Sequence, residues 1–297
     1  MALCQGAYPD INPKTIINWV GQLWAFVNRI QVGDLIVLPL KSRAAIAIGR
    51  STGPYRHLPD LPPDARHTRT VEWLQRDIPR TAFDQDLLYS LGAFMTVCQI
   101  RRNNAEERIK TVLDGRPSAP AVPRQTEAAE PDEEALPNLE EYAQDQIRAY
   151  IDRKYKGHDL ARLVTAVLKA QGYRTYTASP GPDGGADIMA GRGPMGFDPP
   201  RLCVQVKSGS QPADVRVLRE LQGVMRNFGA EQGLLVSWGG FKSTVFTEAS
   251  RLFFQIRLWD SGDIVQNLLE HYDQLPEDLQ AELPLKRIWT LVQEEAE

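Results

Sequence analysis

Two acidic residues in a glycine turn precede a segment that carries a glutamine and a lysine. The turn reads GPDGGADI, with Asp183 and Asp187, and the later segment reads LCVQVKSG, with Gln205 and Lys207. Carboxylate and amide oxygens can bind a hard cation such as Mg²⁺, and a lysine ammonium can stabilise a neighbouring anion. Alternation along a strand places Gln205 and Lys207 on the same face. These residue types and this spacing predict a polar site on neighbouring strands.

Hydrophobic periodicity predicts the elements that position these residues. HDLARLVTAVLKAQGY has the apolar spacing of one helix face and ends at Gly172, a helix C-terminal signal. RTYTAS is predicted as an edge strand, ADIMAG and RLCVQVKSG as an antiparallel pair, and EQGLLVSWGG as a buried strand reached through the helix PADVRVLRELQGVMRNFG. STVFTEASRLFF and QIRLWDS then repeat helix and strand. The pattern predicts an α/β fold with a mixed sheet flanked by helices.

The ordered motifs resemble a known family. GPDGGAD, then CVQVK, then LRELQGVMRNFGAEQGLLVSWGGF are similar to the catalytic domain of Mrr-type restriction endonucleases, within the PD-(D/E)xK nuclease superfamily. The resemblance covers residues 155–270 and depends on the order of the motifs, because an acid followed by Q-x-K is common by chance. It implies a restriction-endonuclease-like fold and metal-dependent hydrolysis of DNA phosphodiester bonds.

The resemblance also implies roles for the residues of the two motifs. Asp187 is expected to bind the metal, and Gln205 stands where many members have Glu or Asp. The Gln205 amide oxygen and the Val206 carbonyl are the other expected ligands of Mg²⁺, for which Mn²⁺ could substitute. Lys207 is expected to orient the attacking water and to stabilise the scissile phosphate. Asp183 is either a further acid of the site or a cap of the turn, and the sequence leaves both readings open.

The expected DNA contacts lie in the turn and beyond the second strand. Gly184 and Gly185 are expected to permit a close approach of the DNA backbone. Gln222 matches a family position that faces the site, whereas Arg216 and Lys242 are candidate phosphate contacts whose alternative is ordinary solvated surface.

One position departs from the family pattern. The early helix often carries a Glu where this chain has Ala161. Asp159 nearby is interpreted as a helix N-cap, and it could replace that Glu only in a different backbone register. The departure makes one alternative to a restriction enzyme credible, a catalytically weakened nuclease fold that serves as a DNA-binding or scaffold protein. A structure-specific repair nuclease is a separate alternative. A homodimer or larger homo-oligomer is expected, because cutting two strands requires two sites.

An acidic, proline-rich segment at 114–138 predicts a flexible linker between residues 1–113 and residues 139–297. In the second part, an apolar periodicity within residues 276–297 predicts helices packed on the domain. In the first part, TIINWVGQLWAFVNRI has helical spacing, VGDLIVLPL and AAIAIGRSTGPY are predicted strands, and QDLLYSLGAFMTVCQI is predicted as a helix followed by a strand.

The N-terminal part is thus predicted to be a smaller α+β domain, and over residues 19–80 it weakly resembles PUA-like and EVE-like domains that hold a flipped base. Trp24, Tyr55 and Trp73 could stack on a base, which would make this part a reader of DNA or of a modified base. The alternative for Trp24 is a place in the core, on the apolar face of its helix.

Composition excludes several classes of protein. A net charge of −4 argues against a surface coated with basic residues, so contact with DNA must rely on local patches. Three scattered cysteines fit neither a disulfide framework nor a zinc cluster. Without a signal peptide or an apolar span in the sequence, we expect a cytoplasmic protein with no membrane contact.

Overall fold

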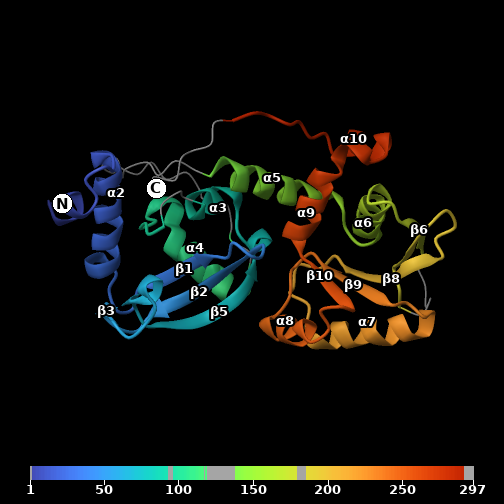
Figure 1. Cartoon of the computed structure of the whole chain (residues 1–297), viewed down its shortest axis with the longest axis horizontal. Helices are drawn as coiled ribbons and strands as arrows, with labels where there is room; N and C mark the ends of the chain where they lie inside the picture. Colours follow the sequence, from blue (N-terminus) through green and yellow to red (C-terminus); the bar gives the residue numbers. More distant parts are fainter. Residues whose placement is uncertain (1, 93–95, 117, 119–137, 179–184, 291–297) are drawn as a thin grey trace.

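The chain folds into two parts with separate sheets (Figure 1). The computed structural model describes residues 2–92, 96–116, 118, 138–178 and 185–290. Most of the predicted linker, at 117 and 119–137, lies outside the described residues.

The N-terminal part is built on a three-stranded antiparallel sheet in the order β1-β2-β5. These strands are Leu35–Pro39, Ala45–Ser51 and Val71–Pro79, and a separate ribbon pairs β3 (Arg56–His57) with β4 (His67–Thr68). Apolar side chains of β2 and β5 form a core with α3 and α4. The helices are α1 (Ala2–Ala7), α2 (Pro13–Trp24), α3 (Gln85–Leu91) and α4 (Ala105–Leu113). This part is an α+β domain, as predicted.

Two local predictions in this part are wrong. The expected helix exists as α2 and a π-helical turn at Ala25–Arg29, but Trp24 is 53% exposed and is not a core residue. The helix end is held through its backbone instead, because the Arg69 guanidinium donates to the carbonyls of Phe26 and Val27 at 2.6 and 2.7 Å. No strand follows α3 within the described residues 96–101.

The C-terminal part contains the predicted mixed sheet, in the order β10-β9-β8-β7-β6. Strand β7 pairs antiparallel with β6 and β8, whereas β8, β9 and β10 run parallel. The bounds are β6 (Arg174–Thr177), β7 (Ile188–Arg192), β8 (Asp198–Lys207), β9 (Gln232–Ser237) and β10 (Ile256–Trp259). Strand β6 lies at the edge, as predicted.

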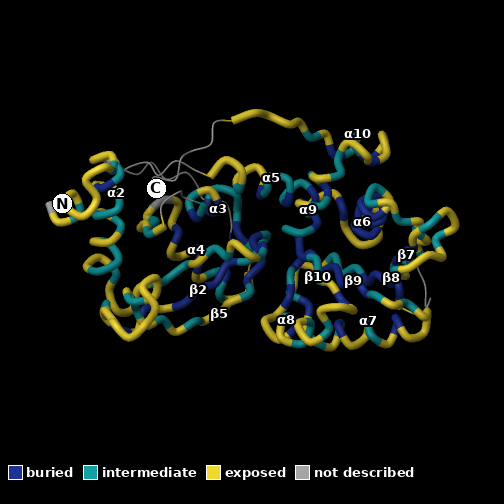
Figure 2. The backbone as a smooth tube through the Cα atoms, in the orientation of Figure 1, coloured by how far each residue is buried: buried dark blue, intermediate teal, exposed yellow. Residues whose placement is uncertain are grey.

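Helices cover both faces of this sheet, and its central strands are buried (Figure 2). Strand β8 alternates between them: Val204 packs toward α5, α6 and α9, whereas Cys203 packs toward α7 and α8. Gln205 and Lys207 therefore lie on the α7 side, two and four residues beyond Cys203. The helices are α5 (Leu139–Lys154), α6 (His158–Ala170), α7 (Val215–Phe228), α8 (Ser243–Ser250), α9 (Ser261–Glu270) and α10 (Glu277–Glu282).

The end of the chain only partly follows its predicted periodicity. Leu279 in α10 and Leu283 after it are buried against the domain, but Ile288 is 76% exposed and lies in no helix. Leu291 lies outside the described residues. No helix in the described part of the chain is long and apolar enough to span a membrane.

Candidate active site

Asp187 lies immediately before β7 and is bound to β8 through both its backbone and its side chain. Its amide donates to the Val204 carbonyl at 2.9 Å, and its carboxylate Oδ2 accepts from the Val206 amide at 2.6 Å. The carboxylate thus takes the place of a backbone carbonyl as the acceptor of the next hydrogen bond between the two strands. Because the N–H and C=O of one strand residue point to the same side, the Val206 carbonyl also faces the Asp187 side of β8.

Gln205 lies opposite Asp187. Ile188 pairs with Val204 in the antiparallel pair of β7 and β8, so the next position places Asp187 across from Gln205. The residue is only 6% exposed, and its Oε1 is buried without a hydrogen-bond partner among the described residues. Burying an unpaired acceptor costs about 1–3 kcal/mol. An oxygen of this kind, beside a carboxylate and a backbone carbonyl, fits the oxygen chemistry of a hard cation.

Lys207 ends β8 next to Ser237 of β9, on the same face as Gln205. Its carbonyl accepts from the Trp238 amide at 2.8 Å, and the Trp238 indole Nε1 donates to Asp152 of α5 at 2.7 Å. These bonds fix the backbone of Lys207. Its ammonium forms no hydrogen bond or ion pair within the described part of the chain, so it is available to an incoming anion.

The candidate metal ligands carry little negative charge. Among the described residues, no group of three or more His, Cys, Asp or Glu could hold a metal ion. The oxygens that fit a cation here are one carboxylate, one amide and one backbone carbonyl, from Asp187, Gln205 and Val206. Asp183 and Gly184 lie outside the described residues.

Gly185, the described end of the glycine turn, packs against α7. Its φ is +91°, and a Cβ there would lie 2.9 Å from Val224 Cγ2. Both the backbone conformation and this contact require glycine. The expected approach of DNA to this turn stays a prediction.

The three predicted DNA contacts lie on and beyond α7. Gln222 is half-buried, Lys242 is exposed just before α8, and Arg216 donates to Glu220 at 3.1 Å. Within the described residues, none of them hydrogen-bonds or ion-pairs with Asp187, Gln205 or Lys207. Their role toward DNA also stays a prediction.

The start of α6 corrects one assignment. The N-cap is Gly157, so Asp159 lies in the first turn and does not cap the helix. Its exposed carboxylate lies 3.8 Å from Arg162. Ala161 is buried, and its carbonyl accepts from the Thr165 hydroxyl at 2.7 Å. The position where the family often has Glu is therefore packed as helix core.

The candidate base-reading residues of the N-terminal part are only partly brought together. Tyr55 contacts the Phe26 ring edge-on, and its hydroxyl is 2.8 Å from His67 Nδ1. Trp24 lies under the Arg29 guanidinium, 5.2 Å from it, and Trp73 packs beside Gly49 of β2. Phe26 and His67 were not predicted; His67 belongs to the β3–β4 ribbon, and Phe26 reaches Tyr55 from the π-helical turn after α2.

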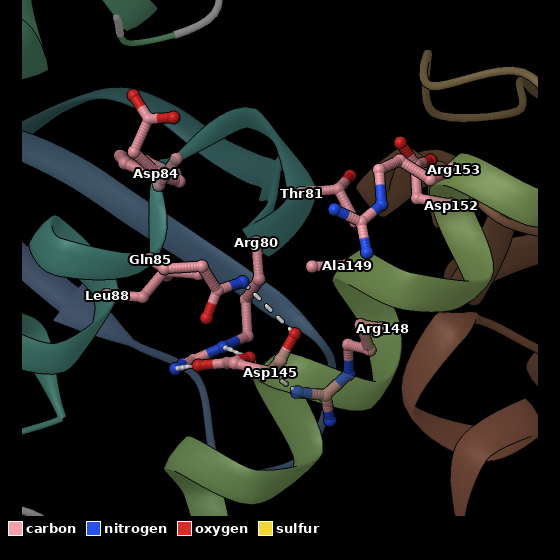
Figure 3. A pocket seen from close by; sticks show the side chains of 11 residues that line it. Arg80, Thr81, Asp84, Gln85, Leu88, Asp145, Arg148, Ala149, Asp152 and Arg153 are labelled. Carbon is pink, nitrogen blue, oxygen red and sulfur yellow. Dashed lines mark hydrogen bonds and ion pairs between the residues drawn. The ribbon is translucent and has the colours of Figure 1, made fainter. Parts of the chain in front are cut away.

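A cavity of about 220 Å³ lies elsewhere, between α5 and the segment Arg80–Leu88 (Figure 3). Arg80 is bound there to Asp145 at 2.6 Å and to Glu141 at 2.8 Å, and Arg148 is bound to Asp145 at 2.6 Å. The acidic and basic groups of this cavity neutralise one another, which is typical of an interface. We therefore assign the chemistry to the end of β8.

Comparison with known proteins gives a family for each of two parts of the chain. Residues 153–268 match the restriction endonuclease family Mrr_cat, and residues 11–96 match a domain of unknown function, DUF8426. No curated protein matches the chain.

Two solved structures are similar in fold. The "DNA modification-dependent restriction endonuclease AspBHI" has 16% identity and a TM-score of 0.38 over 84% of this chain and 60% of its own. The "MspJI Restriction Endonuclease in Complex with 27-mer Oligonucleotide" has 15% identity and a TM-score of 0.34 over 81% of this chain and 58% of its own. The chain thus spans less than two thirds of either structure. The family match over β6–β10 and their helices identifies residues 153–268 as a restriction endonuclease domain of the Mrr_cat family.

Proposed function

We propose that this protein is a metal-dependent DNA endonuclease that hydrolyses phosphodiester bonds, and that it acts in the cytoplasm as a restriction enzyme on foreign or modified DNA. One observation carries the proposal. At the end of β8, the Asp187 carboxylate, the buried oxygen of Gln205 and the ammonium of Lys207 lie on adjoining positions of two paired strands, and the last two have no partner among the described residues. This set occurs within a restriction endonuclease domain.

Each group has a separate task in the proposed reaction. Asp187, Gln205 and the Val206 carbonyl would hold Mg²⁺ or Mn²⁺, which supplies a water of lowered pKa and a Lewis acid for the phosphate. Lys207 places its ammonium beside the scissile phosphate and stabilises the negative charge that grows on its oxygens. The hydrogen bond from the Val206 amide keeps the Asp187 carboxylate oriented toward the end of β8.

The N-terminal part, residues 1–113, is proposed to read the DNA base or its modification. Support comes from two of its aromatic side chains: Trp24 is 53% exposed, and the half-buried Tyr55 contacts the rings of Phe26 and His67. Such rings offer stacking faces for an unstacked base. We further propose that two copies of the chain act together, because one site cuts one strand.

Digestion of matched modified and unmodified phage DNA tests the function. The parent protein is incubated with each DNA in Mg²⁺, in Mn²⁺ and in EDTA, beside Lys207→Ala. The proposal expects cleavage in either metal, none in EDTA, none by the variant, and a preference for one of the two DNAs. Binding without cleavage would indicate a scaffold protein. Cleavage of branched DNA regardless of modification would indicate a repair nuclease.

A further inference from the structure

Ser237 is a second polar group buried without a partner at the end of β8 and β9. The residue is fully buried, and its Oγ forms no hydrogen bond with any described residue. The other five residues of β9 are Gln232 and an apolar run, GLLV, that fills the two cores. A hydroxyl at the buried end of such a strand loses its hydration and gains nothing from the fold.

The register of the sheet fixes what this hydroxyl faces. Ser237 pairs with Lys207, and Leu235, two residues earlier, pairs with Gln205. Residues paired in a sheet share a face, so Ser237, Lys207 and Gln205 all lie on the α7 side. The bond from the Trp238 amide to the Lys207 carbonyl keeps the two strands in this register up to their ends.

Two unsatisfied groups of opposite character are therefore neighbours. The Lys207 ammonium has three donors and no hydrogen-bond or ion-pair partner within the described residues, whereas Ser237 Oγ has unused acceptor capacity. In the free protein the two do not bond to each other. Contacts of a catalytic group are often long in a free enzyme and shorten only when substrate is bound.

We propose that Ser237 is a positioning residue for Lys207: when DNA occupies the site, the hydroxyl oxygen accepts one hydrogen bond from the ammonium and directs its other donors to the scissile phosphate. This inference rests on the proposed nuclease function and adds a residue to it. Ser237 itself touches neither the DNA nor the metal.

The proposal predicts that Ser237→Ala slows cleavage without lowering the stability of the protein. Ser237→Ala removes a desolvated hydroxyl that has no partner, so the metal-free variant unfolds at the same temperature as the parent or higher. It loses the positioning bond, so single-turnover cleavage slows by roughly tenfold or more, while the dissociation constant for DNA stays within about twofold. Ser237→Thr keeps a hydroxyl and restores at least part of the rate.

The matched control is Thr175→Val on β6, because the Thr175 hydroxyl is also buried without a partner in the described part of the chain but lies on the edge strand, separated from β8 by β7. Its cleavage rate should equal that of the parent. A parental rate in Ser237→Ala, or a parallel loss of rate and unfolding temperature, would overturn the positioning role. Absence of cleavage by the parent itself, on any DNA and in either metal, would instead overturn the proposed function, and this inference with it.

Discussion

Two groups of buried polar side chains, one at the contact of α5 with the N-terminal part and one at the end of β8, differ in how their members are paired. We call Arg80, Glu141, Asp145 and Arg148 the α5 ion-pair cluster. Its carboxylates and guanidinium groups are joined at 2.6–2.9 Å, with Asp145 shared between the two arginines. At the end of β8, Gln205 Oε1 and Ser237 Oγ are buried with no partner among the described residues.

The difference separates structural from reactive polar groups. Burial lowers the pKa of the Arg80 guanidinium, but the hydrogen bonds and charges of Asp145 and Glu141 outweigh it and leave that pKa raised, so Arg80 stays charged. Each side chain of the cluster forms an ion pair within the protein, although Arg148 Nε is buried without a hydrogen bond to any described residue. Gln205 Oε1 and Ser237 Oγ have no described partner at all, and under the proposed function a cation and a phosphate would offset the free energy cost of burying them.

The largest effect expected is on cleavage. Lys207→Ala and Asp187→Asn should each reduce it by roughly 10³-fold or more, because they remove the charge that stabilises the phosphate or holds the metal. Asn keeps an acceptor for the Val206 amide, so both variants should unfold near the parental temperature. Single-turnover kinetics and thermal unfolding measure the two quantities. Lys169→Ala, an exposed lysine on α6, is the control, and cleavage by purified Lys207→Ala would refute the site.

In the α5 ion-pair cluster, a substitution should instead lower the stability of the protein. Asp145→Ala leaves Arg80 and Arg148 buried without their shared carboxylate, so the free energy of unfolding should fall by about 3–5 kcal/mol. Urea unfolding measures it. The control is Glu106→Ala, whose partner Lys110 is exposed, and it should leave stability unchanged. If both variants unfold alike, the cluster does not hold α5.

The sequence was sufficient for the sheet that carries the site. Apolar and polar residues alternate in CVQVK, and a helical pattern separates two apolar runs, so the strands could be predicted. The structure confirms β6 to β10 in their predicted places. The proximity of Asp187 to Gln205 also followed from an antiparallel pair. These relations join segments that follow one another in the chain, so the sequence of those segments is enough to predict them.

Contacts between distant segments left no such pattern. Arg80 and Asp145 are 65 residues apart, and nothing in either segment marks them as partners. Ser237 lay in a predicted strand, yet its place beside Lys207 depends on the parallel register of β8 and β9. The core alternative for Trp24 is wrong because helical periodicity identifies an apolar face but not whether another element covers it.

A pH-dependent effect of smaller size is expected where α9 begins. Burial, together with the nearby charge of Asp260, raises the pKa of the Asp263 carboxyl from 3.8 to about 6. The folded state then binds its proton more tightly than the unfolded state, so this group lowers the free energy of unfolding as pH rises from about 4 to 6. Asp263→Asn keeps the acceptor for the Asp260 amide and removes this loss. Denaturant unfolding at pH 7 should show a gain of about 3 kcal/mol that vanishes near pH 4. An equal gain at both pH values would contradict this role of Asp263.

The smallest expected change concerns metal binding by Gln205. A carboxylate in its place would add a negative ligand beside Asp187, and ligand charge strengthens the binding of a hard cation. Gln205→Glu should therefore bind Mg²⁺ or Mn²⁺ about tenfold more tightly than the parent when DNA is absent, whereas Gln205→Ala should bind more weakly and cleave more slowly.

The neutral glutamine of the parent implies that metal and DNA bind cooperatively, because the phosphate supplies the charge that the protein lacks. Titration calorimetry with each metal, with and without an uncleavable DNA, measures this coupling. It should be large in the parent and smaller in Gln205→Glu, since the new carboxylate already supplies part of the charge. Gln266→Glu adds the same charge at an exposed position of α9, on the opposite face of the sheet, and should leave both affinities unchanged. If Gln205→Glu binds metal no better than Gln266→Glu, Gln205 Oε1 does not face the cation, and its missing partner must be a water or the DNA.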